Sequence, residues 1–177
     1  MKSLVEILKE EPTDKLANGF GEFYEELFRP IRHTALRILE IGIAQGGSLR
    51  AWKKYFTKAD IYGLDIEADF VEAAREFRIR TFKIDAGNWA QLSGWACDQS
   101  FDVIIDDGSH NSNDIDCAFK VLWSRCSSYY IIEDAQAPHA RQIIDYFASF
   151  AFNTVLNGSV IENLMFRPYM IVLQKKC

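Results

Sequence analysis

The chain has 177 residues, of which 49% are hydrophobic and 25% are charged, and its formal net charge at pH 7 is −5. This size and composition predict one globular domain with a sizeable core, and the acidic balance gives no electrostatic reason to expect nucleic acid or an anionic membrane as a partner. No apolar run is long enough to span a bilayer, and acids inside the first ten residues argue against a signal peptide, so we expect a cytoplasmic protein.

The first 35 residues have a mixed helical pattern with breaks at Pro12 and at the Asn18-Gly19 pair. We expect this segment, residues 1–35, to pack on a cofactor-binding domain formed by residues 36–177. From residue 37 onward, apolar runs that suit strands buried on both faces alternate with helical patterns. The strands are expected at residues 37–43, 60–66, 79–85, 101–106 and 129–133, followed by 154–161 and 169–174.

Helices are expected between these strands, at residues 48–56, 69–77, 88–97, 113–126 and 139–150. Asn88 and a residue among Asn111 to Asn113 are suitable N-caps. The last two strands have no clear helix between them, which indicates a hairpin. The pattern therefore predicts a doubly wound, Rossmann-like α/β fold with a seven-stranded, mostly parallel sheet and one antiparallel edge strand.

The four cysteines, Cys97, Cys117, Cys126 and Cys177, show no spacing typical of a metal site. Cys117 and Cys126 fall within the helical pattern at residues 113–126. We therefore expect buried free thiols, as in a reducing cytoplasm.

A glycine-containing loop follows the first strand. Residues 40–42 read Glu-Ile-Gly, and the loop continues through Gly46 and Gly47 to Ser48, where a helix is expected. Such glycines permit a tight turn and let a ligand approach the helix N-terminus. Ala44 occupies the second glycine position of the Gly-x-Gly-x-x-Gly pattern, so the loop disfavours NAD.

Acids end the next two strands. Asp65 lies where an acid accepts hydrogen bonds from ribose hydroxyls, and Asp85 lies within reach of a bound purine. Each residue alone could serve only a turn or a helix cap. Because all three loops fall at successive strand ends, we predict a ribose-bearing cofactor.

A second acidic region ends the fourth and fifth strands. Residues 106–110 read Asp-Asp-Gly-Ser-His, and residues 133–134 read Glu-Asp. Adjacent strand residues point to opposite faces, so Asp106 is assigned to the cofactor side and Asp107 to a second centre. The fourth and fifth strands are usually neighbours in such a sheet, which would bring Glu133 and Asp134 close to Asp107.

Clustered carboxylates repel each other unless a cation lies among them. An all-oxygen set selects a hard ion, with Mg²⁺ favoured over Mn²⁺ or Ca²⁺. His110 is the candidate general base for a substrate hydroxyl. A turn at Asp107-Gly108, a helix cap at Asp134 and a solvated His110 are the purely structural alternatives.

These motifs resemble the metal-dependent macrolide-sugar O-methyltransferases of the mycinamicin and tylosin type, which are class I S-adenosylmethionine enzymes. The cephalosporin-hydroxylase-like proteins share much of the pattern. The resemblance spans roughly residues 13–136. Its motifs are Thr13-Asp14-Lys15, Tyr24-Glu25, Phe28-Arg29-Pro30-Ile31-Arg32, Leu39-Glu40-Ile41-Gly42, Gly46-Gly47-Ser48-Leu49, Trp52, Tyr55-Phe56, Ile61-Tyr62-Gly63-Leu64-Asp65-Ile66, Ile105-Asp106-Asp107-Gly108-Ser109-His110 and Ile132-Glu133-Asp134.

The resemblance implies a role for each candidate residue. Asp107, Glu133 and Asp134 would bind Mg²⁺, and His110 would deprotonate the acceptor hydroxyl. The residues around S-adenosylmethionine would be Glu40, Gly42, Ser48, Asp65, Asp85 and Asp106. The family's further N-terminal assembly domain is not expected in this chain, and the short stretch after Asp134 predicts reduced acceptor loops.

The sequence therefore predicts an S-adenosylmethionine-dependent, Mg²⁺-assisted O-methyltransferase acting on a sugar or glycoside hydroxyl. Methylation of a phenolic or other small-metabolite diol by the same residues is an alternative. A non-catalytic cofactor-binding module is another, although such a module needs neither His110 nor the acids, and an oxidoreductase is a fourth. The expected partner is a sugar or small-molecule acceptor, and a homo-oligomer is compatible with the sequence.

Overall fold

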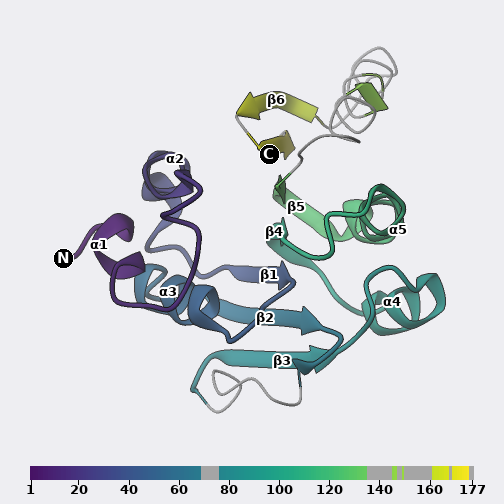
Figure 1. Ribbon diagram of the computed structural model, residues 1–177, viewed down its shortest axis with the longest axis horizontal. Coiled ribbons are helices and arrows are strands. Elements are labelled where there is room, and N and C mark those ends of the chain that lie inside the picture. The colour runs from purple at the N-terminus through teal and green to yellow at the C-terminus, as the bar shows by residue number, and fades with distance from the viewer. Residues whose placement is uncertain (69–75, 135–144, 147–148, 150–160, 168, 176–177) are drawn as a thin grey trace. The chain divides into compact units, whose positions relative to one another are not determined.

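The structure, a computed structural model, describes residues 1–68, 76–134, 145, 146, 149, 161–167 and 169–175. Seven strands form a sheet in the order β3-β2-β1-β4-β5-β7-β6 (Figure 1). The predicted α/β fold with a mostly parallel seven-stranded sheet is thus confirmed. The chain divides into two compact units, Met1–Ile84 and Asp85–Cys177. The expected boundary at residue 35 stays a prediction.

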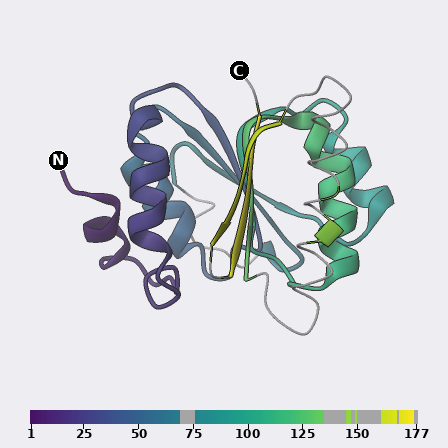
Figure 2. The ribbon, with the colours of Figure 1, turned by 90° about the horizontal axis from the view of Figure 1, so that it is seen from above.

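The first unit has three parallel strands with helices on one side (Figure 2). Ser3 begins the first helix with a capping box, in which its side chain and that of Glu6 each bond the other's backbone N–H. Gly19 begins the second helix in a left-handed conformation, at the break predicted there. The elements are α1 Leu4–Leu8, α2 Phe20–Phe28, the 3-10 turn η1 Arg29–Ile31, β1 Arg37–Ile41, α3 Gly47–Tyr55, β2 Asp60–Asp65 and β3 Ile79–Lys83.

An aromatic cluster forms much of the core of this unit. Trp52 of α3 packs edge-on against Tyr24 and Phe28 of α2, at ring-centroid distances of 5.1 and 5.9 Å. Gly63 of β2 lets α3 approach the sheet, because a Cβ there would lie 2.9 Å from both Ile43 and Leu49. These contacts anchor α3, and so the loop that precedes it.

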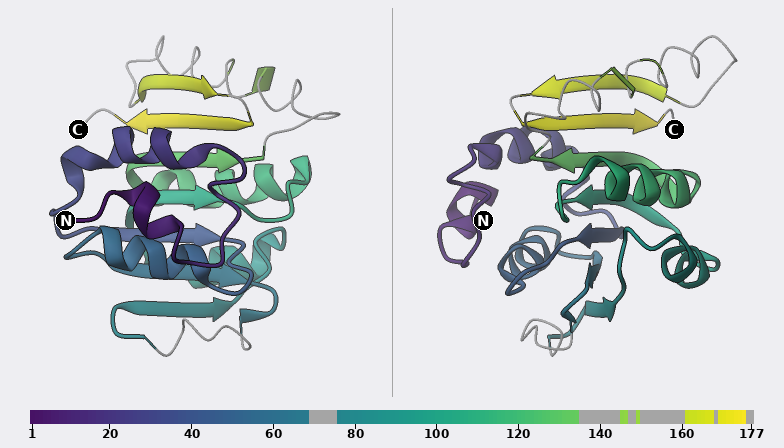
Figure 3. Two further views of the ribbon diagram at one scale, coloured as in Figure 1. Left: turned by 60° about the vertical axis from the view of Figure 1, so that its left-hand side comes forward. Right: turned by 45° about the vertical axis from the view of Figure 1, so that its right-hand side comes forward.

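The second unit contains the parallel pair β4 and β5 and a C-terminal hairpin. The helices at residues 89–96 and 112–122 lie on the same side of these strands (Figure 2). The reversed strand is β7, which lies between β5 and β6 and is antiparallel to both (Figure 3). The elements are α4 Trp89–Ala96, β4 Phe101–Asp106, α5 Ser112–Leu122, the 3-10 turn η4 Trp123–Arg125, β5 Cys126–Glu133, β6 Ile161–Arg167 and β7 Met170–Lys175.

Two predicted boundaries in this unit were wrong. The helix expected to reach residue 126 ends at Leu122, and Cys126 is already the first residue of β5. The reason is strand pairing, because Cys126 is in register with Phe101 of β4. The strand expected to end at residue 161 instead continues as β6 to Arg167.

Most of two predicted helices, at residues 69–77 and 139–150, and residues 154–160 of a predicted strand lie outside the described residues. In the described part of the chain, no helix is long and apolar enough to cross a membrane.

Candidate functional site

The loop between β1 and α3 turns through three left-handed residues. Gly42, Ala44 and Gly46 have φ angles of 77°, 42° and 75°. The Gly42 amide donates to the Leu64 carbonyl at 2.8 Å, which ties the start of the loop to β2. Ala44, at the predicted second-glycine position, therefore has a left-handed φ with a side chain present, a conformation that few non-glycine residues adopt.

The Asp65 carboxylate stabilises this loop from the end of β2. Its Oδ2 accepts hydrogen bonds from the amides of Ile43 at 3.0 Å and Ala44 at 3.3 Å, and its Oδ1 accepts one from Glu67 at 2.9 Å. A carboxylate has about four acceptor positions. Three are used here, so Asp65 retains capacity for a ligand hydroxyl.

Glu40 and Ser48 flank the loop, and both are buried. The Glu40 carboxylate accepts from the Trp52 indole at 3.0 Å and lies 3.0 Å from the Lys15 ammonium, with both side chains of this ion pair 0% exposed. Ser48 is in the first turn of α3, whose N-cap residue, Gly46, has no capping side chain. The Glu40 side chain is therefore occupied by core contacts, whereas the α3 N-terminus presents backbone N–H groups.

In the second unit, the loop after Ile84 packs against α5. Asp85 is exposed, and its Oδ1 accepts from the Gly87 amide at 2.9 Å. A Cβ on Gly87 would lie 2.5 Å from the Asp114 carboxylate, so a larger residue at this position would require the Asp114 side chain to shift. The other oxygen of Asp114 accepts a 2.6 Å hydrogen bond from the Ser109 hydroxyl, which links this loop to the segment containing His110.

Asp106 and Asp107 differ sharply in their surroundings. Asp106 is buried, and its Oδ2 has no hydrogen-bond partner among the described residues. Burial raises the pKa of Asp106 to about 7, and the charges of Asp107 and Asp114 act in the same direction against a hydrogen bond from Gly108. Asp107 is half-buried. The expectation that the two acids serve different surroundings agrees with this difference in burial.

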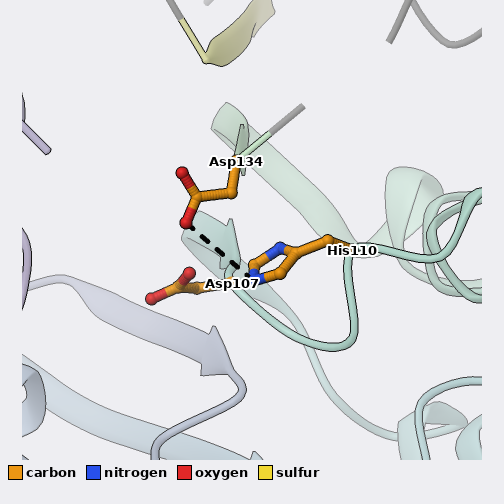
Figure 4. Close-up of side chains that lie close together, drawn as sticks. All are labelled: Asp107, His110 and Asp134. Atoms are coloured by element: carbon orange, nitrogen blue, oxygen red, sulfur yellow. Dashed lines mark ion pairs between the residues drawn. The ribbon is translucent and has the colours of Figure 1, made fainter. Parts of the chain in front are cut away.

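Asp107, His110 and Asp134 form a compact group (Figure 4). One potential ligand atom from each residue lies within 4.8 Å of the others, and His110 Nε2 lies 3.9 Å from Asp134 Oδ2. The His110 side chain is 38% exposed, so the group is accessible to a ligand. The two carboxylates suit a hard divalent cation, and the imidazole beside them is a group that can accept a proton.

Backbone conformation brings these side chains together. His110 and Asp134 have φ angles of 57° and 48°, so each lies at a sharp turn after its strand. Asn111 then caps α5, its side chain accepting from the Asn113 amide at 2.9 Å. Asp and His are among the non-glycine residues that tolerate such angles best.

The group differs from the predicted metal set in one member. Glu133 was expected as the third carboxylate, but it is 1% exposed and does not belong to the group found among the described residues. His110, expected only as a base, is within the group. The roles of all ten candidate residues stay predictions.

Two contacts had no counterpart in the sequence analysis, namely the Lys15–Glu40 pair and the packing of Pro12 against Gly47, where a Cβ would lie 2.1 Å from the Pro12 carbonyl. The sequence contained one indication that Lys15 matters, since Lys15 belongs to the Thr13-Asp14-Lys15 motif of the family resemblance.

Comparison with known proteins supports the resemblance. The chain is 39% identical over 126 residues to an 8-demethyl-8-α-L-rhamnosyl tetracenomycin-C 2′-O-methyltransferase of Streptomyces olivaceus, and 38% identical over 126 residues to the mycinamicin VI 2″-O-methyltransferase of Micromonospora griseorubida. These matches cover 66% and 65% of this chain but 33% and 31% of the relatives. The chain thus spans about a third of the length of these curated relatives.

Among solved structures, the fold matches the MycE methyltransferase of the mycinamycin pathway in complex with Mg and SAH. The TM-score is 0.86 at 25% identity, covering 98% of this chain and 54% of that chain. A MycE complex with Mg, SAH and mycinamycin VI gives a TM-score of 0.84 at 27% identity. No family model matches the sequence. The predicted resemblance to macrolide-sugar O-methyltransferases is therefore confirmed.

Proposed function

We propose that this chain is an S-adenosylmethionine-dependent, Mg²⁺-assisted O-methyltransferase that acts on a sugar hydroxyl of a glycosylated small molecule. The observation that supports it best is the group of Asp107, His110 and Asp134 at the ends of β4 and β5. Relatives that share 34–39% identity with this chain are named as O-methyltransferases, several of them for a sugar position.

The loop between β1 and α3, residues 42–47, suits an S-adenosyl group. In the first unit, we assign Asp65 to the ribose hydroxyls and Gly42 and the α3 N-terminus at Ser48 to the amino-acid part of the cofactor, because backbone N–H groups there favour a carboxylate. In the second unit, we assign Asp85 and Asp106 to the cofactor. When bound, S-adenosylmethionine would supply an electrophilic methyl group.

The acidic group fits Mg²⁺. Asp107 and Asp134 offer carboxylate oxygens, which Mg²⁺ prefers over nitrogen. Glu133, the residue before Asp134, remains our predicted third carboxylate. Bound Mg²⁺ would lower the pKa of an acceptor hydroxyl and neutralise the clustered negative charge.

His110 is then available for the proton. Because oxygen ligands satisfy a hard cation, the imidazole is left to act as the general base rather than as a ligand. Its Nε2 lies 3.9 Å from Asp134 Oδ2, so the imidazolium formed by accepting the proton would have a carboxylate nearby. Much of the rate gain would come from orienting the hydroxyl and stabilising its developing charge.

Two classes of acceptor molecule are candidates for the proposed methyl transfer. A sugar hydroxyl is favoured by the names of the relatives, and a phenolic or other small-metabolite diol is the second candidate. A cytoplasmic location belongs to the same proposal. Acceptor panels of aryl glycosides and catechols, assayed with labelled S-adenosylmethionine, separate the two classes.

Metal dependence provides the decisive test. We expect chelation, or Asp107→Asn, to lower methyl transfer by about a hundredfold or more, since a bound cation contributes several kcal/mol of charge stabilisation. Added Mg²⁺ should restore the chelated enzyme but not the variant. Asp116→Asn is the matched control, because Asp116 is an α5 acid that pairs with Lys120 at 2.6 Å and is not a member of the Asp107, His110 and Asp134 group. Full activity after exhaustive chelation would exclude the metal role.

A further inference from the structure

A short N-terminal segment contacts α3 and the end of β1, on either side of the loop at residues 42–47. The residues that make these contacts are Glu11, Pro12 and Lys15. We call residues 11–15, which connect α1 toward α2, the strap. The Glu11 carboxylate accepts from Arg50 Nε at 2.7 Å and from Lys54 Nζ at 2.6 Å. The Arg50 guanidinium also reaches the Gln45 carbonyl at 3.5 Å, inside the loop itself. The strap is therefore tied by charge to the loop and to α3.

The middle of the strap packs directly on the α3 N-terminus. A Cβ added to Gly47 would lie 2.1 Å from the carbonyl oxygen and 2.7 Å from the carbonyl carbon of Pro12. Since backbone atoms cannot move aside as a flexible side chain can, Gly47 and the strap must be in close contact in the folded chain.

The end of the strap contacts the residue that precedes the loop. Lys15 Nζ lies 3.0 Å from Glu40 Oε1, and the Trp52 indole donates to Glu40 Oε2 at 3.0 Å. Lys15 also lies over the Trp52 ring, 5.9 Å from its centroid. Both charged side chains are 0% exposed. Removing one partner of such a buried ion pair lowers the stability of the fold, because the other charge is then buried without a counter-charge or water.

We propose that Lys15 is a positioning residue for the cofactor, acting through Glu40 on the conformation of loop residues 42–47. Glu40 is two residues before Gly42, and its buried carboxylate pairs with Lys15 and accepts a hydrogen bond from the Trp52 indole. In this proposal, Glu40 serves the cofactor by orienting the end of β1. This inference rests on the proposed function, since it assumes that the loop receives an S-adenosyl group.

The test compares Lys15→Met, Glu40→Gln and the double variant, with S-adenosylhomocysteine as the probe. Affinity is measured by calorimetry well below the melting temperature of each variant. We expect each single change to raise the dissociation constant by about tenfold or more, as removing a supporting partner of a ligand-binding residue does at metal sites. The double variant removes both charges and should recover part of this loss.

Lys175→Met is the matched control. Lys175 is also a buried lysine over a tryptophan ring, 4.3 Å from the centroid of Trp123, and it donates to the Trp123 carbonyl at 2.6 Å in the second unit. Lys175 belongs to the second unit, whereas the strap and the loop belong to the first. We expect Lys175→Met to lower the melting temperature without changing the affinity for S-adenosylhomocysteine.

The outcomes separate the two proposals. If Lys15→Met binds S-adenosylhomocysteine as tightly as the wild-type chain, Lys15 has only a structural role. If Lys15→Met does not fold, Lys15→Arg retains the charge with altered geometry, and an unchanged affinity in that variant and in Glu40→Gln would overturn the inference. A wild-type chain that does not bind S-adenosylhomocysteine would instead contradict the proposed function.

Discussion

At the scale of single residues, the candidate metal centre depends on two unusual backbone conformations. His110 and Asp134 both have positive φ angles, although neither is glycine. Such conformations cost free energy and persist where the surroundings determine them. The Ser109–Asp114 hydrogen bond at 2.6 Å and the Asn111 cap of α5 are the local interactions that hold the segment around His110.

This conformation makes His110→Asn a sharper test than an alanine variant. Asparagine also tolerates a positive φ, so the change removes the base without adding backbone strain. We expect methyl transfer to fall by about 10²- to 10⁴-fold, the usual contribution of general base catalysis, while binding of S-adenosylhomocysteine is unchanged. Initial rates over a range of pH and calorimetric titration measure the two effects.

His33→Asn is the control for this substitution. His33 is exposed in the first unit, where its Nδ1 lies 3.1 Å from the Thr57 hydroxyl. The His33 variant should keep the wild-type rate. A His110→Asn enzyme that keeps its full rate at every pH would remove His110 from the role of base.

At the scale of elements, the two glycines at the start of α3, Gly46 and Gly47, serve different purposes. Gly46 has the left-handed φ that the turn requires, whereas Gly47 permits the close approach of the Pro12 carbonyl. From the sequence, both were expected to form a turn that a ligand approaches. The reason for Gly47 depends on the strap, which is distant along the chain.

Paired glycine substitutions test this difference. Gly47→Ala should lower the free energy of unfolding by about 1–3 kcal/mol, the usual cost of overpacking. Gly94→Ala, in the interior of α4 with nothing within 4 Å of the added Cβ, should raise it by up to about 1 kcal/mol because alanine favours the helix. Urea titrations with an unchanged m-value measure both. Equal stability of Gly47→Ala and the wild-type chain would contradict the close contact between Gly47 and Pro12.

At the scale of the whole molecule, burial decides which thiols react. Cys97 is exposed, Cys117 is half-buried and Cys126 is buried, and all three are free. The predicted burial of Cys126 is thus confirmed, although the residue begins a strand rather than lying in a helix, whereas Cys117 is less buried than predicted. Burial raises the pKa of the Cys126 thiol from 9.0 to about 12, against a smaller opposite effect of Lys175.

We therefore expect iodoacetamide at pH 8 to label Cys97 in the native chain and to spare Cys126, because the thiolate is the reactive form. Urea should expose both. Because the folded pKa is raised, the stability from keeping this thiol protonated is present below pH 9 and is lost as the pH rises toward 12. Mass spectrometry of labelled peptides gives the rates, and equal labelling of the two cysteines in the native chain would contradict the burial of Cys126.

Much of the fold was predictable because its signals are local. The apolar runs placed β1, β2, β4 and β7 to within about two residues, the accuracy expected for element boundaries, and Asn88 and Asn111 are the helix caps that were expected. The boundary at Cys126 was missed because strand pairing with Phe101 outweighs local helical pattern. The spacing of apolar residues along the chain does not indicate which strand a segment will pair with.

The sequence by itself determined the alternation of strands and helices and the presence of acids at the strand ends, since both follow from the order of apolar and polar residues along the chain. Only the tertiary structure decided three contacts. Lys15 forms an ion pair with Glu40, Gly47 packs against the Pro12 carbonyl, and His110 lies close to Asp107 and Asp134. The physical reason is that these contacts depend on turns with positive φ and on segments that return from far along the chain. Neither leaves a periodic signal in the sequence.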